Sequence, residues 1–396
     1  MRYVSTRRGS PSVDFTGALL GGLAPDGGLY VPEAIPSLPS GWERWSYAEA
    51  VSSVLELFGA ADNRELVDQA AGEFHHDAVA PIVPVGDRHI LELFWGPTLS
   101  FKDHALQVLV RLLSRAVDRG VILGATSGDT GSAAMEACLG HDNLEIFVLY
   151  PEGRVSDFQR RQMTTLAGAN VHAVAVQGTF DDCQRLVKEA FATRPGLLAV
   201  NSINWARIAA QTGFHVHAAG RMAGRYDVVV PTGNFGHVYS CWLAKQMGAP
   251  IERITIATNA NRYLADLVAD GDAKTGVVVP TLAPAMDIQV PSNLERLGVE
   301  PAGEFSAGWV DDAGILETIS EVERLHRYRL DPHTAIAWRV GAETRTDLPQ
   351  LVVATAHPAK FDDRVPPPSW FHPLDTREER FTTIDPVATA LDALVR

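Results

Sequence analysis

From Ile90 onward, the chain alternates short and almost wholly apolar runs with longer segments of helical periodicity. The apolar runs are ILELFW (90–95), GVILGAT (120–126), LEIFVLYP (144–151), VHAVAVQG (171–178), YDVVVPTG (226–233), RITIATN (253–259) and PQLVVATAHP (349–358). Between them, segments such as 99–117 and 180–192 repeat apolar residues at the spacing of one helix face. Buried strands that alternate with amphipathic helices are typical of parallel sheets covered on both faces. The sequence therefore predicts an α/β fold with doubly wound, mostly parallel sheets.

The length of the chain and the changes in residue pattern along it predict how it is divided into lobes and segments. Its 396 residues exceed what one simple core accommodates, so we expect two lobes. Residues 1–88 are irregular and rich in glycine and proline turns, with one convincing helix in SYAEAVSSVLELFGA. Residues 89–365 carry the strand–helix alternation. Residues 366–396 form a tail, and the stretch VPPPSWFHPL lies at its start.

Charge and composition exclude several classes of function. Lys and Arg number 34 against 48 Asp and Glu, a formal net charge of −14, which disfavours nucleic acid and anionic membrane as partners. No apolar run approaches the ~20 residues that span a bilayer, and the N-terminus lacks the apolar region of a secretory signal. Cys138, Cys183 and Cys241 lie far apart, which indicates a reduced protein and no cysteine-bound metal. We expect a cytoplasmic protein without a metal site.

In an open parallel sheet, ligands bind beyond the carboxyl ends of the strands, so the loops there are the informative places. The loop ATSGDTGSA (125–133) follows a predicted strand and opens a helix. Gly128 and Gly131 allow backbone N–H groups to converge, and Ser127 and Thr130 add hydroxyl donors. This pattern predicts an anion site, although a capped helix start with turn glycines has the same signature.

The loop VVVPTGNFGHV (228–238) has the same character. Gly233, Asn234, Phe235 and Gly236 separate an apolar strand from a helix, a setting that suits a phosphate at the helix N-terminus. The loop is neither a P-loop nor a G-x-G-x-x-G dinucleotide motif. An ordinary glycine-rich turn is the alternative.

Basic residues stand near two further helix starts. Ser202, Asn204 and Arg207 lie in VNSINWARIAAQ, and Arg154 lies in YPEGRVSDFQ after a strand. Arginine with amide and hydroxyl donors is a good site for phosphate or carboxylate. A single such arginine is more often a solvated surface cation, but two such loops in so acidic a chain favour an anion-binding role.

Two residues complete the set of candidates. Thr355 ends a buried strand, where a neutral hydroxyl can bond a heteroaromatic nitrogen, or only its own backbone. Lys102 starts a long amphipathic helix after Ser100, a plausible N-cap, and both the helix dipole and burial beside Phe101 lower the pKa of its ammonium group. A reactive lysine, several anion sites and a strand-end hydroxyl together predict pyridoxal 5'-phosphate bound covalently to Lys102.

At these residues the chain resembles the threonine synthase family, of the longer bacterial and fungal type, among the fold-type II pyridoxal-phosphate enzymes. The resemblance rests on eight blocks in the family's order: TGALLGGLAPDGGLYVP, LELFWGPTLSFKDHALQ, ATSGDTGSAA, VNSINWARIAAQ, VPTGNFG, APAMDIQVPSNLERL, DPHTAIAW and ATAHPAKF. It implies an N-terminal extension and two open, mostly parallel sheets with the active site between them. The smaller lobe then spans roughly residues 105–215, and the protein is a monomer or a homodimer.

The resemblance also implies a role for each candidate residue. Lys102 corresponds to the lysine that attaches the cofactor. The loop of Gly233, Asn234, Phe235 and Gly236 corresponds to the cofactor phosphate site, and Thr355 to the residue that faces the pyridine nitrogen. Ser127, Asp129 and Thr130 correspond to the loop that receives the substrate carboxylate, with Asp129 beside the cofactor's 3'-oxygen. Arg154, Ser202, Asn204 and Arg207 correspond to the site of the substrate phosphate.

The activity implied is the conversion of O-phospho-L-homoserine and water to L-threonine and phosphate. Trp95, His104 and His237 depart from the family's usual residues, so a related enzyme stays open: a phospholyase, or an enzyme that uses another nucleophile on a phosphorylated amino acid. A binding protein without catalysis is disfavoured because Lys102 and the glycine loop are both present. A nicotinamide dehydrogenase is disfavoured because the dinucleotide motif is missing.

Overall fold

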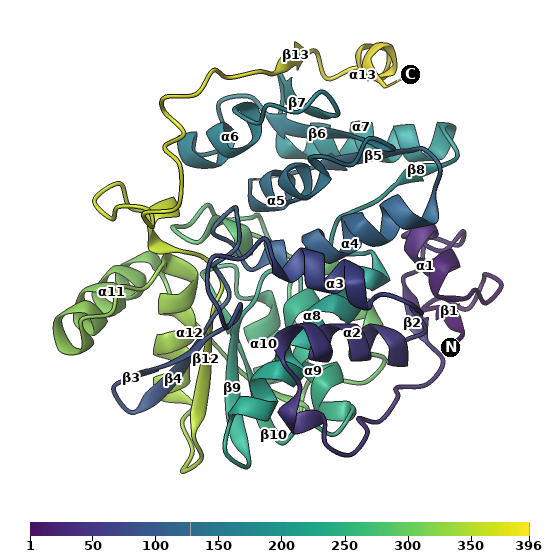
Figure 1. Ribbon diagram of the computed structural model, residues 1–396. Helices are drawn as coiled ribbons and strands as arrows, with labels where there is room; N and C mark the ends of the chain where they lie inside the picture. The colour runs from purple at the N-terminus through teal and green to yellow at the C-terminus, as the bar shows by residue number, and fades with distance from the viewer. Residues whose placement is uncertain (127, 396) are drawn as a thin grey trace.

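The computed structural model describes residues 1–126 and 128–395, which form two main sheets with helices packed around them (Figure 1). The larger sheet has the order β11-β10-β9-β12-β4-β3, and the smaller has the order β13-β7-β6-β5-β8. All neighbouring strands are parallel except β3 and β4, which are antiparallel. The predicted α/β fold with two open, mostly parallel sheets is confirmed.

The strands coincide closely with the apolar runs. In the larger sheet they are β3 (Ile82–Val85), β4 (Arg88–Glu92), β9 (Tyr226–Pro231), β10 (Ile251–Thr258), β11 (Phe305–Trp309) and β12 (Gln350–Ala354). In the smaller sheet they are β5 (Gly120–Ala125), β6 (Leu144–Pro151), β7 (Val171–Val176), β8 (Leu197–Leu198) and β13 (Thr382–Ile384). Every residue of β9 and β12 is buried, which explains why these two runs are mostly apolar rather than alternating, with Asp227 and Gln350 as their polar members.

Helices connect these strands and cover the sheets. They are α4 (Lys102–Ala116), α5 (Asp129–Cys138), α6 (Asp157–Thr164), α7 (Phe180–Thr193), α8 (Trp205–Arg221), α9 (Gly236–Gln246), α10 (Tyr263–Asp270), α11 (Asp312–His326), α12 (Pro332–Glu343) and α13 (Ala388–Leu394). Short 3₁₀ turns include η1 (Trp42–Arg44), η2 (Pro284–Met286), η3 (Ser292–Arg296) and η4 (Pro358–Lys360). None of the helices in the described part of the chain combines the length and the apolarity that crossing a membrane requires.

The N-terminal segment is more regular than predicted. Besides the two-stranded antiparallel sheet of β1 (Tyr3–Ser5) and β2 (Tyr30–Pro32), it contains α1 (Phe15–Gly21), α2 (Tyr47–Leu57) and α3 (Arg64–Ala71). Only α2, which begins with a capping box, was expected. The other two helices have seven and eight residues, too few for a clear periodic signal, and glycine stands in α1.

The segment does not form a core of its own. Tyr3, Phe15 and Val54 lie in the same apolar cluster as Leu109 of α4 and Val228 of β9. Helix α2 packs directly against α8. The N-terminal segment therefore buttresses the helices from which the candidate site is built.

The tail crosses the molecule and joins the smaller sheet, as the yellow trace in Figure 1 shows. Its strand β13 pairs with β7 in parallel, and α13 packs against α7. Ile384, Leu391 and Val395 are buried in the apolar cluster of the smaller sheet. The smaller lobe thus includes a strand far in sequence from residues 105–215, because the exposed edge of β7 accepts it.

Candidate active site

The candidate residues lie where strands of both sheets end. Asp129 follows β5 of the smaller sheet, whereas the glycine loop follows β9 and Thr355 follows β12 of the larger sheet. The Phe101 N–H donates to the Thr355 carbonyl at 2.8 Å, and the His357 N–H donates to the Leu99 carbonyl at 3.0 Å. These backbone bonds hold the start of α4 against the end of β12, so the site lies between the two sheets.

Lys102 begins α4 with its side chain almost wholly enclosed. Its side chain is 12% exposed, and burial lowers the pKa of its ammonium group, an effect that the nearby Asp129 carboxylate partly opposes. The cap position is Phe101 rather than the expected Ser100, although the Ser100 hydroxyl still accepts from the Lys102 N–H at 3.4 Å. Leu99, just before, has φ 60, a left-handed conformation that is strained for leucine and typical of functional turns.

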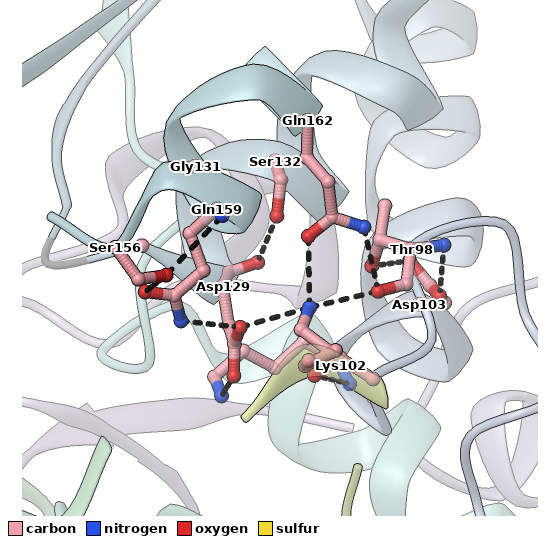
Figure 2. Close-up of polar contacts among 12 residues, drawn as sticks. Thr98, Lys102, Asp103, Asp129, Gly131, Ser132, Ser156, Gln159 and Gln162 are labelled. Carbon is pink, nitrogen blue, oxygen red and sulfur yellow. Dashed lines mark hydrogen bonds and ion pairs between the residues drawn. The ribbon is translucent and has the colours of Figure 1, made fainter. Parts of the chain in front are cut away.

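Asp129 is the centre of a buried polar network, most of which Figure 2 shows. Its Oδ2 lies 3.1 Å from Lys102 Nζ, and its Oδ1 lies 2.9 Å from Lys360 Nζ and accepts from Gln159 Nε2 at 2.8 Å. Burial alone would raise the pKa of this carboxyl, but the two ammonium groups outweigh burial and hold the pKa well below its usual range. Asp129 is thus an ionised carboxylate with both oxygens engaged.

The sequence analysis did not identify the residues that hold Asp129. Lys360 follows β12 on η4, and Gln159 lies on α6 with Gln162 one turn further, so both amides face the network. Gly128 has φ 146, and a Cβ on it would lie 2.4 Å from the Gln159 side chain, so glycine is needed for this contact. Two features of the sequence could have identified these residues: the two glutamines at i, i+3 spacing and the lysine that follows AHPA.

The glycine loop forms a tight connection between β9 and α9. A Cβ on Gly233 would lie 2.5 Å from the Ala285 carbonyl oxygen, so another backbone segment fills that space. The left-handed residue of the loop is Phe235 (φ 64), whereas Gly233 and Gly236 do not have positive φ. The first N–H groups of α9 remain available to an anion, because a helix leaves them without intrahelical acceptors.

The Asn234 side chain is fixed between two segments. Its Oδ1 accepts from the Ser292 N–H at 2.6 Å, and its amide donates to the Ser202 hydroxyl. Ser202, predicted at the substrate site, therefore lies beside the predicted cofactor loop. The two anion-binding loops are neighbours in space.

At the start of α8, two predicted residues have very different surroundings. Asn204 is the N-cap: its Oδ1 accepts from the Ala206 N–H at 3.0 Å, and its amide donates to two backbone carbonyls. Arg207 is 3% exposed, and within the described residues the one hydrogen bond of its guanidinium goes to the Val200 carbonyl at 3.2 Å, leaving Nε without a partner. Burial lowers the pKa of Arg207 to about 10.

Of the remaining predicted residues, Thr130 is half-buried on the first turn of α5, and Thr355 is buried at the end of β12. Arg154 is exposed in the turn between β6 and α6, on the smaller lobe. The structure does not bring Arg154 into hydrogen-bond contact with Ser202. Ser127 lies outside the described residues.

The three departures from the family's usual residues are all used in packing. Trp95 Nε1 donates to Glu92 at 2.9 Å, and His104 Nδ1 lies 2.7 Å from the Tyr47 hydroxyl. The His237 ring stacks on Phe101 with 4.6 Å between ring centroids, and neither of its nitrogens has a partner among the described residues. Burial lowers the pKa of His237 well below its usual range, so this ring is neutral beside Lys102.

These groups fit a phosphorylated aldehyde cofactor. The enclosed Lys102 amine is suited to attach an aldehyde, because lowering its pKa favours the nucleophilic neutral form. The close-packed loop at Gly233 presents helix N–H groups to a phosphate, and the buried Arg207 has no carboxylate partner among the described residues, so it can take a second anion. A phosphorylated cofactor and a phosphorylated substrate would use both.

Comparison with known proteins agrees with this assignment. A family model described as pyridoxal-phosphate dependent enzyme matches residues 91–358, and models described as threonine synthase N terminus and threonine synthase, C-terminal match residues 2–70 and 334–395. Threonine synthase of Pseudomonas aeruginosa is 41% identical, over 100% of this chain and 98% of that protein. The tail, unfamiliar from its sequence, thus lies mostly within a matched region.

Solved structures give the same result. The pyridoxal-phosphate-bound threonine synthase of Brucella melitensis has a TM-score of 0.94 and 40% identity, covering 100% of this chain and 98% of that chain. Threonine synthase from yeast has a TM-score of 0.92 and 32% identity, again covering 100% and 98%. The chain therefore belongs to the threonine synthase family of pyridoxal-phosphate-dependent enzymes.

Proposed function

We propose that this protein converts O-phospho-L-homoserine and water into L-threonine and phosphate, with pyridoxal 5'-phosphate attached to Lys102. The proposal rests on the presence of two groups in one site. Lys102 is enclosed, and Arg207 is a buried cation without a carboxylate partner among the described residues. The first suits the cofactor, and the second suits a phosphorylated substrate. When bound, pyridoxal phosphate supplies an electron sink for charge developed at the substrate's α-carbon.

Lys102 is the residue that moves protons in this proposal. Once the substrate amine replaces it, the freed amine lies within the site and can take the α-proton and return protons to neighbouring carbons. Burial helps, because it lowers the pKa of the ammonium group and so favours the neutral form. Asp129 keeps the amine in place through the 3.1 Å contact.

The other predicted residues bind and orient. The loop of Gly233, Asn234, Phe235 and Gly236 holds the cofactor phosphate at the start of α9, and Thr355 faces the pyridine nitrogen. Ser127 and Thr130 receive the substrate carboxylate, while Asp129 borders the cofactor's 3'-oxygen.

The substrate phosphate belongs to Arg207, Ser202 and Asn204, with Arg154 approaching from the smaller lobe. Asn204 acts indirectly: both of its amide hydrogens are donated to backbone carbonyls, so it holds the start of α8 in place and donates nothing to the phosphate. A buried guanidinium stabilises the charge that builds on a leaving phosphate.

Product identification tests the proposal. Purified protein loaded with pyridoxal phosphate is incubated with O-phosphohomoserine, and the products are identified by NMR and mass spectrometry. We expect threonine and inorganic phosphate in equal amounts. A 2-oxo acid and ammonia would assign a phospholyase instead, and a product that forms only with an added amine or thiol would assign another nucleophile.

Lys102→Ala is the matched control for that experiment. It should abolish turnover and prevent borohydride from fixing the cofactor to the protein, while far-ultraviolet circular dichroism stays unchanged. Fixed cofactor on another lysine, with turnover retained, would overturn the assignment of Lys102.

A further inference from the structure

Asp129 contacts two lysines, and the mechanism above uses only one of them. We propose that Lys360 is a positioning residue that keeps the Asp129 carboxylate ionised and fixed in one orientation while Lys102 carries no charge. The proposal rests on Lys102 being the attachment lysine. It does not depend on which phosphorylated amino acid is the substrate.

The position of Lys360 is fully determined by its neighbours. Its side chain is 0% exposed, and Nζ lies 2.9 Å from Asp129 Oδ1. The same Nζ donates to the Thr98 carbonyl at 2.8 Å and to Gln162 Oε1 at 3.0 Å. An ammonium group has three N–H donors, and these three acceptors use all of them, so Lys360 has no donor left for a ligand.

The Thr98 turn makes this arrangement rigid. The Thr98 carbonyl also accepts from Gln162 Nε2 at 2.9 Å, and the Thr98 hydroxyl and N–H donate to Asp103 at 2.7 and 2.9 Å. Figure 2 shows Thr98, Asp103 and Gln162 gathered on one side of Asp129. Lys360 is thus tied to α4 and to α6, the helix that also supplies Gln159.

A second cation is needed because the charge of Lys102 is temporary. Lys102 is neutral when it attacks an aldehyde, and it cannot carry its original ammonium charge while it is attached to the cofactor. Asp129 would then be a buried carboxylate whose remaining direct partner is the neutral Gln159 amide. Such a group takes up a proton instead of staying charged. Lys360 prevents this because its own charge takes no part in the chemistry.

Lys360 also acts on Lys102 itself. The charged groups that bear on Lys102 are Asp129, which favours the ammonium form, and Arg207 and Lys360, which disfavour it. His237 packs nearby as a neutral ring, and Asp103 lies on the Thr98 side of Lys360. Removing Lys360 should therefore raise the pH at which Lys102 becomes a nucleophile.

The first test measures attachment of pyridoxal phosphate to apoprotein as a function of pH. Borohydride reduction followed by peptide mass spectrometry gives the fraction of Lys102 modified. In Lys360→Met the midpoint should rise by about one pH unit or more, the size expected for losing one charge at this range. Lys188→Met, which removes an exposed lysine of α7, should leave the midpoint at the wild-type value.

The second test follows the protonation of Asp129 in the protein loaded with pyridoxal phosphate. The absorbance of bound pyridoxal phosphate should stay flat between pH 5 and 8 in wild type and acquire a titration in Lys360→Met, since Asp129 then takes up a proton. Gln162→Glu keeps Lys360 but gives it a competing carboxylate, so it should produce the same changes to a smaller extent. If Lys360→Met does not fold, both pH profiles are measured on Gln162→Glu instead.

A merely structural lysine would lower the melting temperature of Lys360→Met and leave both pH profiles unchanged, and that result would overturn the proposal. Normal profiles in Gln162→Glu would overturn it as well. If the protein makes no threonine but the pH shifts are present, the proposed reaction is wrong and the role of Lys360 stands.

Discussion

At the scale of single residues, the site is defined by how its buried charges are paired. Asp129 has two ammonium partners, whereas Arg207 has one backbone carbonyl and an Nε without a partner among the described residues. A buried cation in that condition is costly to the fold unless an anion reaches it. The imbalance at Arg207 therefore supports the proposal that the substrate's negative charge binds there.

Arg207→Ala tests this reading. The cofactor should still attach to Lys102 and keep its absorbance, because in the proposed site its phosphate binds the loop before α9; only the pH of attachment should rise, since Arg207 disfavours the ammonium form of Lys102. The value of kcat/KM for O-phosphohomoserine should fall by about ten- to a hundredfold or more, as expected for a lost charge-assisted hydrogen bond. Inorganic phosphate should inhibit wild type competitively and the variant much less. Bleaching of the cofactor would place Arg207 at the cofactor instead, and Arg225→Ala, an exposed arginine, is the control.

At the scale of elements, the loop before α9 depends on one close backbone approach. The two glycines of that loop differ sharply in what surrounds them. A Cβ on Gly233 would lie 2.5 Å from the Ala285 carbonyl oxygen, whereas a Cβ on Gly236 would find its nearest atoms at 3.4 Å. The left-handed conformation is carried by Phe235, whose ring is buried against Phe305.

The two alanine variants should therefore behave differently. Gly233→Ala must displace either the loop or the Ala285 segment, so the Kd for pyridoxal phosphate should rise severalfold or more. Gly236→Ala should bind the cofactor nearly as wild type does, because its Cβ has room. Equilibrium dialysis of the two apoproteins measures both values. Equal affinities would mean that the cofactor phosphate binds elsewhere.

At the scale of the whole molecule, the tail ties distant parts of the chain together. Trp370 stacks on His75 of the N-terminal segment, and Phe371 stacks on Phe158 of α6. Glu379 pairs with Arg160 of the same helix. Since α6 also presents Gln159 and Gln162 to the site, the tail supports the helix that positions the network around Asp129.

Truncating a buried leucine of the tail should destabilise the protein. Leu391→Ala removes a side chain that is 1% exposed, so the free energy of unfolding should fall by roughly 2–5 kcal/mol, as for other buried leucines. Leu325→Ala, at a position 53% exposed, should change it by less than about 1 kcal/mol. Urea denaturation of both variants measures the difference. Equal, small effects would show that the tail contributes little to stability.

Buried histidines should make the whole molecule sensitive to mild acid. Burial lowers the pKa of His104 and His215 to about 3 and of His217 and His357 to about 4. Between these values and the unfolded pKa of about 6.5, the unfolded chain binds more protons than the native one, so stability falls as pH falls. Burial also raises the pKa of Glu136 to about 7 and of Asp103 to about 6, which acts in the opposite sense.

Burial also lowers the pKa of His237 well below its usual range, so five histidines against two carboxyls leave about three protons in favour of the unfolded state near pH 5.5. The free energy of unfolding should therefore drop by roughly 3–4 kcal/mol per pH unit as the pH is lowered from 6.5 to 5. Urea titrations at pH 7, 6 and 5 give this slope directly. A stability independent of pH in that range would show that these histidines gain a proton in the native state.

The sheets and several residues that carry chemistry could be predicted from the amino-acid sequence. Continuous apolar runs such as the one at β9 can only be strands buried on both faces, and the loops that follow them must meet at the carboxyl ends of parallel sheets. Lys102 and Gly233 were predicted in this way, because their signals lie within a few residues, whereas Asp129 was predicted only from the family resemblance.

Tertiary structure alone decided which of these groups touch, because partners that are distant in the chain leave no local signal. Lys360 meets Asp129 across more than half of the chain, and β13 joins a sheet whose other strands end near residue 198. Asn204 caps a helix and Arg207 has no carboxylate partner among the described residues, although both had the same sequence signature. Burial and pairing set the charge of each group, and both properties belong to the packed molecule rather than to any segment of it.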